Sequence, residues 1–207
     1  MSRYTGPKCR LCRRQGGKLF LKGPRCYSAN CAFEKRPVPP GSHRGGRRRL
    51  SDYGLQLREK QKVRFLYGIT EEQFENYFDS ATKVPGVTGE TLLSLLERRL
   101  DNVIFRAGMA DSRSEARQMV LHGHFMVNGR KVNIPSYLVE ERNVITLSEK
   151  GKKNQKIKEI MEEEVKPLPA WLEVNPDTRE IRILRNPERG DIDYPIQEQL
   201  IVEFYSK

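Results

Sequence analysis

Long apolar runs are missing from this sequence. No stretch approaches the roughly eighteen consecutive apolar residues of a membrane-spanning helix, and the N-terminus has no apolar core typical of secretory signals. We therefore expect a cytoplasmic chain with no membrane partner. Aromatic side chains are also scarce, at 8% of 207 residues. With 37% hydrophobic residues, the chain can build one or two modest cores but not a large enzyme.

Acidic residues are nearly absent from the first fifty positions. Residues 1–50 contain 14 Lys or Arg and one acid, Glu34, whereas residues 51–207 contain 24 Lys or Arg and 26 Asp or Glu. The formal net charge of +11 is therefore concentrated at one end of the chain. Since Lys and Arg that neutralise phosphates release counterions, this distribution indicates a polyanionic partner, either nucleic acid or an anionic membrane surface.

The sequence also lacks an evident active site. An RNA-modifying enzyme would need a positioned nucleophile or carboxylate in a substantial pocket, and no such motif stands out. His122 and His124 have no nearby carboxylate or cysteine partner in the sequence, so packing or RNA contact suits them better than acid–base chemistry. His43 lies in a basic linker, where it could stack on a base or be solvated. We expect no enzymatic activity and no small-molecule substrate.

Only four cysteines are present, and their spacing is informative. Cys9 and Cys12 form a C-x2-C pair, and Cys26 and Cys31 follow beyond a glycine-containing segment. Disulfides are rare in the reducing cytosol, whereas four thiolates can bind one metal ion. Structural zinc suits such a closed site; an iron–sulfur cluster is the alternative, and unmetallated or disulfide states are also open. The pattern predicts a metal-bound knuckle with no open catalytic position.

Residues 36–49 follow this knuckle and combine Pro, Gly and cations, which excludes burial in a core and regular secondary structure. The segment is predicted to be an extended basic linker. It could be a solvated connector, but its position beside a basic knuckle favours an arm embedded in RNA.

Helical periodicity begins at Ser51. Ser51 can cap a helix that ends at Gly68, and Thr70 begins a capping box that opens a second helix. A third helix, capped by Thr88, is predicted to carry a stripe of leucines through to Gly108. This stripe is expected to be core.

A fourth helix and a small sheet are predicted next. Ser112 and Glu115 form a capping box for a helix that stops at Gly123. The Asn-Gly pair at residues 128–129 is typical of a type I′ hairpin between short strands, and residues 144–147 form a further strand. Two helices therefore lead into a sheet.

Charge changes again towards the C-terminus. Residues 106–158 contain eleven cations and five acids, whereas residues 159–207 contain six and twelve. An acidic segment is poorly suited to phosphate, so it is expected to face solvent or a basic protein. The apolar ending at residues 200–204 could return to pack on the helical lobe.

Several motifs resemble a known RNA-binding module. RRLDN at residues 98–102, SRSEARQ at 112–118 and GHFMVNG at 123–129 are similar to the module named after ribosomal protein S4. RYTGP at 3–7 and LREKQK at 57–62, with further matches near both ends, resemble the bacterial small-subunit ribosomal protein S4 family in its cysteine-containing form. No segment is left for the catalytic domains of pseudouridine synthases or tyrosyl-tRNA synthetases.

The resemblance implies a structural constituent of the small ribosomal subunit. It implies direct binding of small-subunit ribosomal RNA, organisation of the assembling subunit body, and an influence on translational accuracy together with protein S5, near the messenger entry path. Messenger RNA is a possible further partner. A zinc-dependent DNA-binding regulator is the rival, but the sequence has no recognition-helix signature.

We therefore predict an α+β chain, with a helical domain and an S4-type domain of helices packed on a small, mostly antiparallel sheet. Three domains are expected: a four-cysteine knuckle and basic arm at residues 1–45, a helical lobe at 46–97 completed by 196–207, and an RNA-binding module with a strand-rich extension at 98–195.

Cations and polar residues are the candidate RNA ligands. Arg113 and Arg117 lie one turn apart and can grip phosphates or stack on bases, although ordinary solvated helix cations would have the same spacing. Recognition should be mainly of RNA shape. The full predicted set is Arg3, Arg10, Arg13, Arg14, Arg44, Arg47, Arg48, Arg49, Arg58, Lys60, Lys62, Arg113, Arg117, Gln118, His122, His124, Asn128, Arg130 and Lys131.

Overall fold

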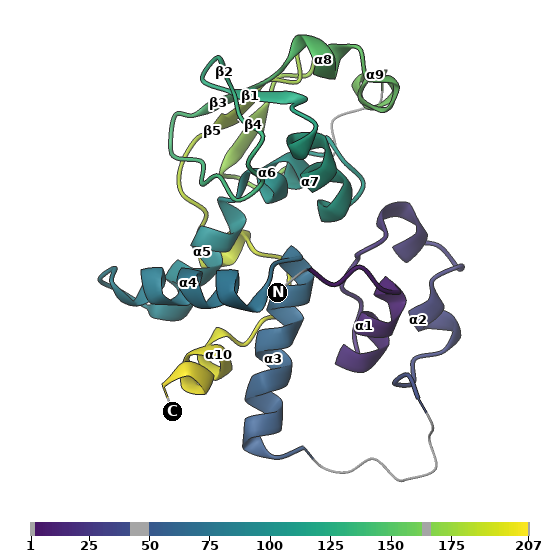
Figure 1. Ribbon diagram of the computed structural model, residues 1–207, viewed down its shortest axis with the longest axis vertical. Coiled ribbons are helices and arrows are strands. Elements are labelled where there is room, and N and C mark those ends of the chain that lie inside the picture. Colours follow the sequence, from purple (N-terminus) through teal and green to yellow (C-terminus); the bar gives the residue numbers. More distant parts are fainter. Residues whose placement is uncertain (1–2, 42–49, 163–166, 207) are drawn as a thin grey trace. The chain divides into compact units, whose positions relative to one another are not determined.

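The computed structural model describes residues 3–41, 50–162 and 167–206 (Figure 1). The chain divides into two compact units: unit 1 comprises Met1–Leu92 and Tyr194–Lys207, and unit 2 comprises Leu93–Asp193. Unit 1 is helical, and unit 2 contains the sheet, so the predicted α+β class is confirmed. No helix within the described ranges is long and apolar enough to cross a membrane.

The first part of unit 1, here called the knuckle, comprises residues 3–41. It contains α1 (Lys8–Gln15), a short 3-10 helix η1 (Gly23–Cys26) and α2 (Ala32–Lys35). Gly16 ends α1 in the left-handed conformation, where its amide donates to the carbonyl of Cys12 at 2.9 Å. The buried interior is small and consists of Leu11, Leu19 and three cysteines. Such a core is too small to fold unaided.

Helices α3 (Asp52–Tyr67) and α4 (Glu71–Thr82) continue unit 1 and begin where the sequence predicts. The Ser51 hydroxyl accepts from the amide of Gly54 at 3.2 Å, and Gly68 ends α3 with a positive φ of 65°. The Thr70 hydroxyl caps α4 in the same way, at 3.3 Å from the amide of Gln73. Both caps satisfy amides that have no partner within the helix.

The C-terminal helix α10 (Glu198–Tyr205) packs on α3 within unit 1. Gln56 donates to the Glu203 carboxylate at 3.0 Å, and the rings of Phe78 and Tyr205 stack at 4.5 Å. The apolar ending of the sequence therefore supplies one wall of the helical lobe.

The third predicted helix is in fact two helices, α5 (Thr88–Glu97) and α6 (Leu100–Arg106), so the expectation of one helix reaching Gly108 is wrong. Arg99 is extended at the break, with ψ 135°. The carbonyl of Arg98 accepts from the amide of Val139 at 2.9 Å, and the amide of Leu100 donates to Tyr137 at 2.8 Å. These bonds to a distant segment replace the helical bonds.

Unit 2 packs its helices on an antiparallel sheet of five strands in the order β2-β1-β3-β5-β4 (Figure 1). The Asn128–Gly129 turn has φ values of 48° and 75°, as a type I′ turn requires, and pairs Val127 with Arg130. The remaining elements of unit 2 are α7 (Arg113–Leu121), β1 (Phe125–Val127), β2 (Arg130–Lys131), β3 (Val144–Leu147), α8 (Glu149–Lys152), α9 (Gln155–Glu162), β4 (Leu172–Val174), β5 (Ile181–Ile183) and a short 3-10 helix η2 (Arg189–Asp191).

The core of unit 2 lies between the helices and the sheet. Leu100, Val103 and Ile104 of α6 contribute the second half of the leucine stripe, and Trp171 is fully buried beside them in the same cluster. The sheet contributes alternate residues, such as Ile181 and Ile183, as the period of two along a strand requires.

Candidate RNA-binding surface

A turn at Gly123 joins α7 to β1 and is fixed by the loop that follows β3. The Ser148 hydroxyl donates to the carbonyl of Gly123, and the Ser148 amide donates to the carbonyl of His124, both at 2.9 Å. Gly151 lies against the same carbonyl: a Cβ there would approach the oxygen of His124 to 2.3 Å. Two segments that are distant in sequence are therefore locked together by backbone contacts.

Four basic side chains surround this turn, and we call them the Gly123 cluster: His122, His124, Lys131 and Lys150. The Lys150 ammonium donates to the carbonyl of His122 at 3.1 Å. The Lys131 side chain lies so close to Gly123 that a Cβ there would meet its Cε at 2.4 Å. His122, Lys131 and Lys150 are exposed. In the part of the chain that the structure describes, neither lysine is paired with a carboxylate. Their charge is therefore available to an anionic ligand.

His124 is the buried member of the cluster. Its Nε2 lies 3.5 Å from the side-chain nitrogen of Asn154, and its ring centroid lies 5.9 Å from that of His122. Burial of the ring, and then the positive charges of Lys150 and His122, lower the pKa of His124 below its ordinary value of 6.5. The folded chain therefore holds His124 neutral where an exposed histidine takes up a proton.

Folding stability is expected to fall as the pH falls below about 6.5, because the unfolded chain then binds a proton that folded His124 accepts less readily. Urea midpoints at about pH 7.5 and about pH 5.5 measure this loss. His124→Asn should lose less stability over the interval than the wild type, whereas the exposed control His122→Asn should keep most of the dependence, because burial of His124 is the largest cause of its lowered pKa. An equal dependence in all three would assign the effect to other groups.

Arg113 and Arg117, predicted to share an RNA-facing surface, have different environments. Arg113 is buried: its Nε donates to the Asn102 side chain at 2.7 Å, and its guanidinium lies 4.6 Å from the centre of the Phe105 ring. Arg117 is about one-fifth exposed and donates to Asp101 at 3.2 Å. Arg113 is therefore largely covered by its neighbours, whereas Arg117 is partly exposed, and RNA contact by either residue stays a prediction.

A buried polar network lies behind Arg117. The Arg99 side chain is 0% exposed and donates to both carboxylate oxygens of Asp101, at 3.0 and 2.7 Å. Asp101 is 3% exposed and also accepts from Arg117. One buried carboxylate thus binds one internal and one partly exposed arginine. The network fixes the guanidinium of Arg117.

The predicted ligands on α3 are largely engaged within unit 1. Lys60 is only 5% exposed; its ammonium is hydrogen-bonded to Glu71 and lies 4.4 Å from the centre of the Phe204 ring. Lys62 binds Glu59 at 3.0 Å and the carbonyl of Pro195. The charge of Lys60 is therefore compensated internally, whereas Arg58 and Lys62 are half-buried. RNA contact by these three residues stays a prediction.

The other predicted ligands are more accessible. Arg13 is half-buried. Exposed positions are occupied by Arg3, Arg10, Arg14, Gln118, Asn128 and Arg130. The side-chain oxygen of Asn128 accepts from the Val144 amide at 2.8 Å, so this residue also holds the hairpin to β3. Arg44, Arg47, Arg48 and Arg49 lie outside the described residues.

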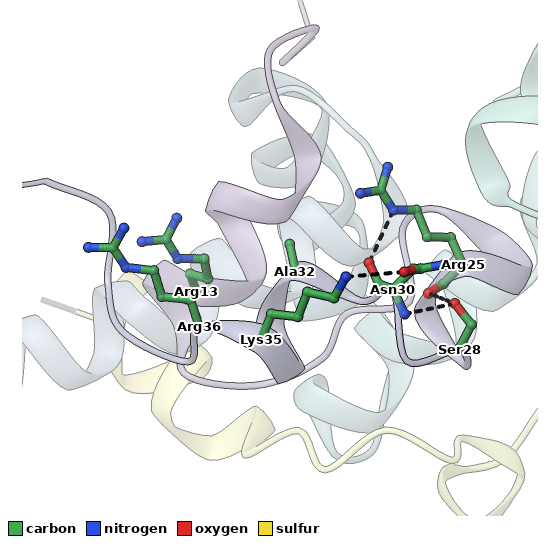
Figure 2. Close-up of a pocket in the computed structure, with 7 residues that line it drawn as sticks. All are labelled: Arg13, Arg25, Ser28, Asn30, Ala32, Lys35 and Arg36. Atoms are coloured by element: carbon green, nitrogen blue, oxygen red, sulfur yellow. Dashed lines mark hydrogen bonds between the residues drawn. The ribbon is translucent and has the colours of Figure 1, made fainter.

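The knuckle has a basic hollow that was not predicted from the sequence. It has a volume of about 690 Å³ and is lined by Arg13, Arg25, Ser28, Asn30, Ala32, Lys35 and Arg36 (Figure 2). Of its cations, only Arg13 is among the RNA ligands predicted from the sequence. The run of cations without acids in residues 1–50 is the available signal, but it does not say which of them converge.

The four cysteines are all in the knuckle and form no disulfide. Cys12, Cys26 and Cys31 are buried, and Cys9 is half-buried. Burial raises the pKa of the Cys12 thiol, and the neighbouring Cys26, Cys9 and Cys31 thiolates raise it further. Nevertheless, no three His, Cys, Asp or Glu side chains among the described residues are close enough together to hold a metal ion. The donors fit zinc in chemistry, but their arrangement is not a closed site.

Two protein-family models match this chain. Residues 3–97 match the family described as ribosomal protein S4/S9 N-terminal domain, and residues 98–145 match the S4 domain. The chain belongs to the ribosomal protein S4 family. Curated S4-family relatives include the small ribosomal subunit protein uS4 of Halothermothrix orenii (58% identical) and of Thermodesulfovibrio yellowstonii (59%), and uS4A of Symbiobacterium thermophilum (56%). Each alignment covers 100% of this chain and of the relative.

The S4-family matches correspond to the two regions that carry the exposed cations. His122, His124 and Lys131 of the Gly123 cluster lie within the S4 domain, whereas Lys150 lies just beyond it. The basic hollow of the knuckle lies in the N-terminal domain. Both parts of the family architecture therefore present cations.

Proposed function

We propose that this chain is a non-enzymatic structural constituent of the small ribosomal subunit that binds small-subunit ribosomal RNA in the cytoplasm. The observation that carries the proposal is the Gly123 cluster, at the end of the S4 domain, where exposed Lys131 and Lys150 are held against a rigid turn and pair with no carboxylate among the residues that the structure describes. Ammonium groups held in this way favour a phosphate chain, and the rigid turn favours recognition of RNA shape.

Binding to ribosomal RNA would give the chain a role in assembly of the subunit body. Two anchored units that each present cations can hold two RNA segments at once, which raises the effective concentration of the second contact. We further propose protein S5 as a neighbour and, with it, an influence on translational accuracy near the messenger entry path. The exposed acids Glu173, Asp177 and Glu188 of the acid-rich C-terminal part suit a basic protein of this kind.

The test is binding of the purified chain to small-subunit ribosomal RNA and to unrelated RNA of equal length. We expect tighter binding to ribosomal RNA, and weaker binding by Lys131→Gln/Lys150→Gln, with the slope of log affinity against log salt lower by about 1 per lost contact. Lys83→Gln/Arg182→Gln removes the same charge elsewhere and should have little effect. Equal affinity for both RNAs would contradict the proposal. The chain's own messenger RNA is tested as a third ligand. Phosphate contacts carry no sequence information, so the same cations can also bind a messenger RNA.

We also propose that Cys9, Cys12, Cys26 and Cys31 bind one structural zinc ion, with an iron–sulfur cluster as the alternative. Supporting this are the four free thiols in one short segment of the knuckle and the burial of three of them. The ion would cross-link a segment whose own core is too small.

Chelation is expected to unfold the knuckle and to leave the helices after Ser51 and unit 2 folded, because their apolar residues pack without the cysteines. Hydrogen exchange of each region, with and without a chelator, measures this difference, and metal analysis with visible absorbance distinguishes zinc from an iron–sulfur cluster. Protein that carries no metal as purified, or that melts globally on chelation, would contradict the prediction.

A further inference from the structure

The turn between β1 and β2 contains a chemically reactive pair of residues. Asn128 is the one asparagine in the sequence that is followed by glycine. The side-chain amide of an asparagine is open to attack by the backbone nitrogen of the next residue, and a glycine, which has no Cβ, hinders that nitrogen least. Asn128 and Gly129 are both exposed, and the space around Gly129 is open. The pair is therefore labile unless the fold restrains it.

The reaction open to this pair is deamidation through a cyclic imide. Hydroxide removes the proton of the Gly129 amide, and the nitrogen forms a bond to Cγ of Asn128. The Cγ–Nδ2 bond breaks, and the leaving nitrogen takes a proton from water and departs as ammonia, which regenerates the hydroxide. Water then opens the five-membered imide at either carbonyl carbon, which leaves aspartate or isoaspartate in place of Asn128. Water is the one co-reactant.

The folded turn keeps the two reacting groups apart. Asn128 has a φ of 48° and Gly129 a φ of 75°, as in a type I′ turn, where ψ of the first residue is about 30°. At this ψ, the Cβ of Asn128 and the nitrogen of Gly129 lie on opposite sides of the Cα–C bond. A five-membered ring needs both on the same side, so attack requires a large rotation about ψ of Asn128.

Two hydrogen bonds to one residue of β3 oppose this rotation. The backbone amide of Asn128 donates to the carbonyl of Val144 at 2.8 Å, and the side-chain oxygen of Asn128 accepts from the amide of Val144, also at 2.8 Å. Val144 pairs in turn with Arg182 of β5, so the turn is tied to the central strand of the sheet. The backbone and the side chain of Asn128 must both leave β3 before the ring closes.

We propose that Asn128 is a deamidation site controlled by the hairpin: it is protected while the turn lies on β3 and reacts when the hairpin opens. Isoaspartate adds a methylene group to the main chain of a two-residue turn, so a chain with this product cannot rebuild the turn. Both products place a negative charge beside Arg130 and Lys131. A resulting loss of RNA affinity rests on the proposed function, but the deamidation itself does not.

The experiment incubates the full, metal-replete chain at mildly alkaline pH, in buffer and in guanidinium chloride above the unfolding midpoint. Peptide mass spectrometry measures deamidation at each asparagine. In denaturant, Asn128 should react fastest, and Gly129→Ala should slow it, because a methyl group crowds the attacking nitrogen. The internal control is Asn133, which is exposed but precedes the β-branched Ile134. In buffer, Asn128 should react at least roughly tenfold more slowly than in denaturant, because attack waits for an opening of the sheet.

A second measurement identifies the opening. At guanidinium concentrations below the midpoint, the deamidation rate of Asn128 should rise in parallel with hydrogen exchange of the Val144 amide. Equal rates in buffer and denaturant, or a rate that does not follow Val144, would overturn control by the hairpin. Reaction of Asn128 no faster than that of Asn133 in denaturant would overturn the site itself. RNA is absent from these measurements, so their outcome is independent of the proposed function.

Discussion

The affinity of the chain for small-subunit ribosomal RNA is expected to fall by roughly 10³ to 10⁵ between about 50 and 200 mM salt. The physical reason is release of the counterions of roughly six to ten phosphates that the bound chain neutralises. The exposed cations of the knuckle, with Lys131 and Lys150 of the Gly123 cluster, supply this number. Filter binding or fluorescence anisotropy at several salt concentrations measures the slope.

Two comparisons make the salt dependence specific. Unrelated RNA should show a similar slope but lower affinity throughout, because the phosphate contacts are shared and the shape-dependent contacts are not. An affinity for ribosomal RNA that does not change with salt would exclude phosphate contacts as the main source of binding.

Removal of the Asp101 carboxylate is expected to destabilise the folded chain by about 3–5 kcal/mol, the usual cost of breaking a buried ion pair. Asp101→Ala leaves the fully buried guanidinium of Arg99 without its carboxylate and frees Arg117 from its fixed position. Urea unfolding followed by circular dichroism measures the change in the unfolding free energy.

The exposed pair of Glu149 and Lys152 provides the control, and Glu149→Gln should leave the unfolding midpoint unchanged. Arg99→Met/Asp101→Leu removes both buried charges and should regain much of the stability lost by Asp101→Ala, because only the partly exposed Arg117 then lacks this carboxylate. If Asp101→Ala is as stable as the wild type, the ion pair contributes nothing to the fold.

Local signals in the sequence predict most element boundaries of this chain. The Ser51 and Thr70 caps and the Asn128–Gly129 turn depend on contacts over two to four residues, and all three are found where predicted. The break at Arg98 and Arg99 escapes such reasoning, because the hydrogen bonds that cause it come from residues 137–139. Helical periodicity continues through the break and conceals it.

In the candidate site, too, features that depend on neighbouring residues are predictable from the sequence, and contacts with distant residues are not. Periodicity identifies which helices carry cations, but it does not identify their partners. The Lys60 ammonium lies over the Phe204 ring, and the Arg113 guanidinium donates a hydrogen bond to Asn102. Two of the predicted ligands, Lys60 and Arg113, are therefore buried, which the pattern of cations along a helix does not reveal. Conversely, Arg25, Lys35 and Arg36 have no helical pattern that marks them, and only the folding of the knuckle brings them to one hollow.

The division of unit 1 between the two ends of the chain has a consequence for synthesis. Unit 2 is continuous in sequence, so all of its residues leave the translating ribosome before α10 does. Until then, the surface of α3 that receives Glu203 and the ring of Phe78 that stacks on Tyr205 stay uncovered. We expect unit 2 to complete its folding first, and unit 1 to wait until α10 has been synthesised.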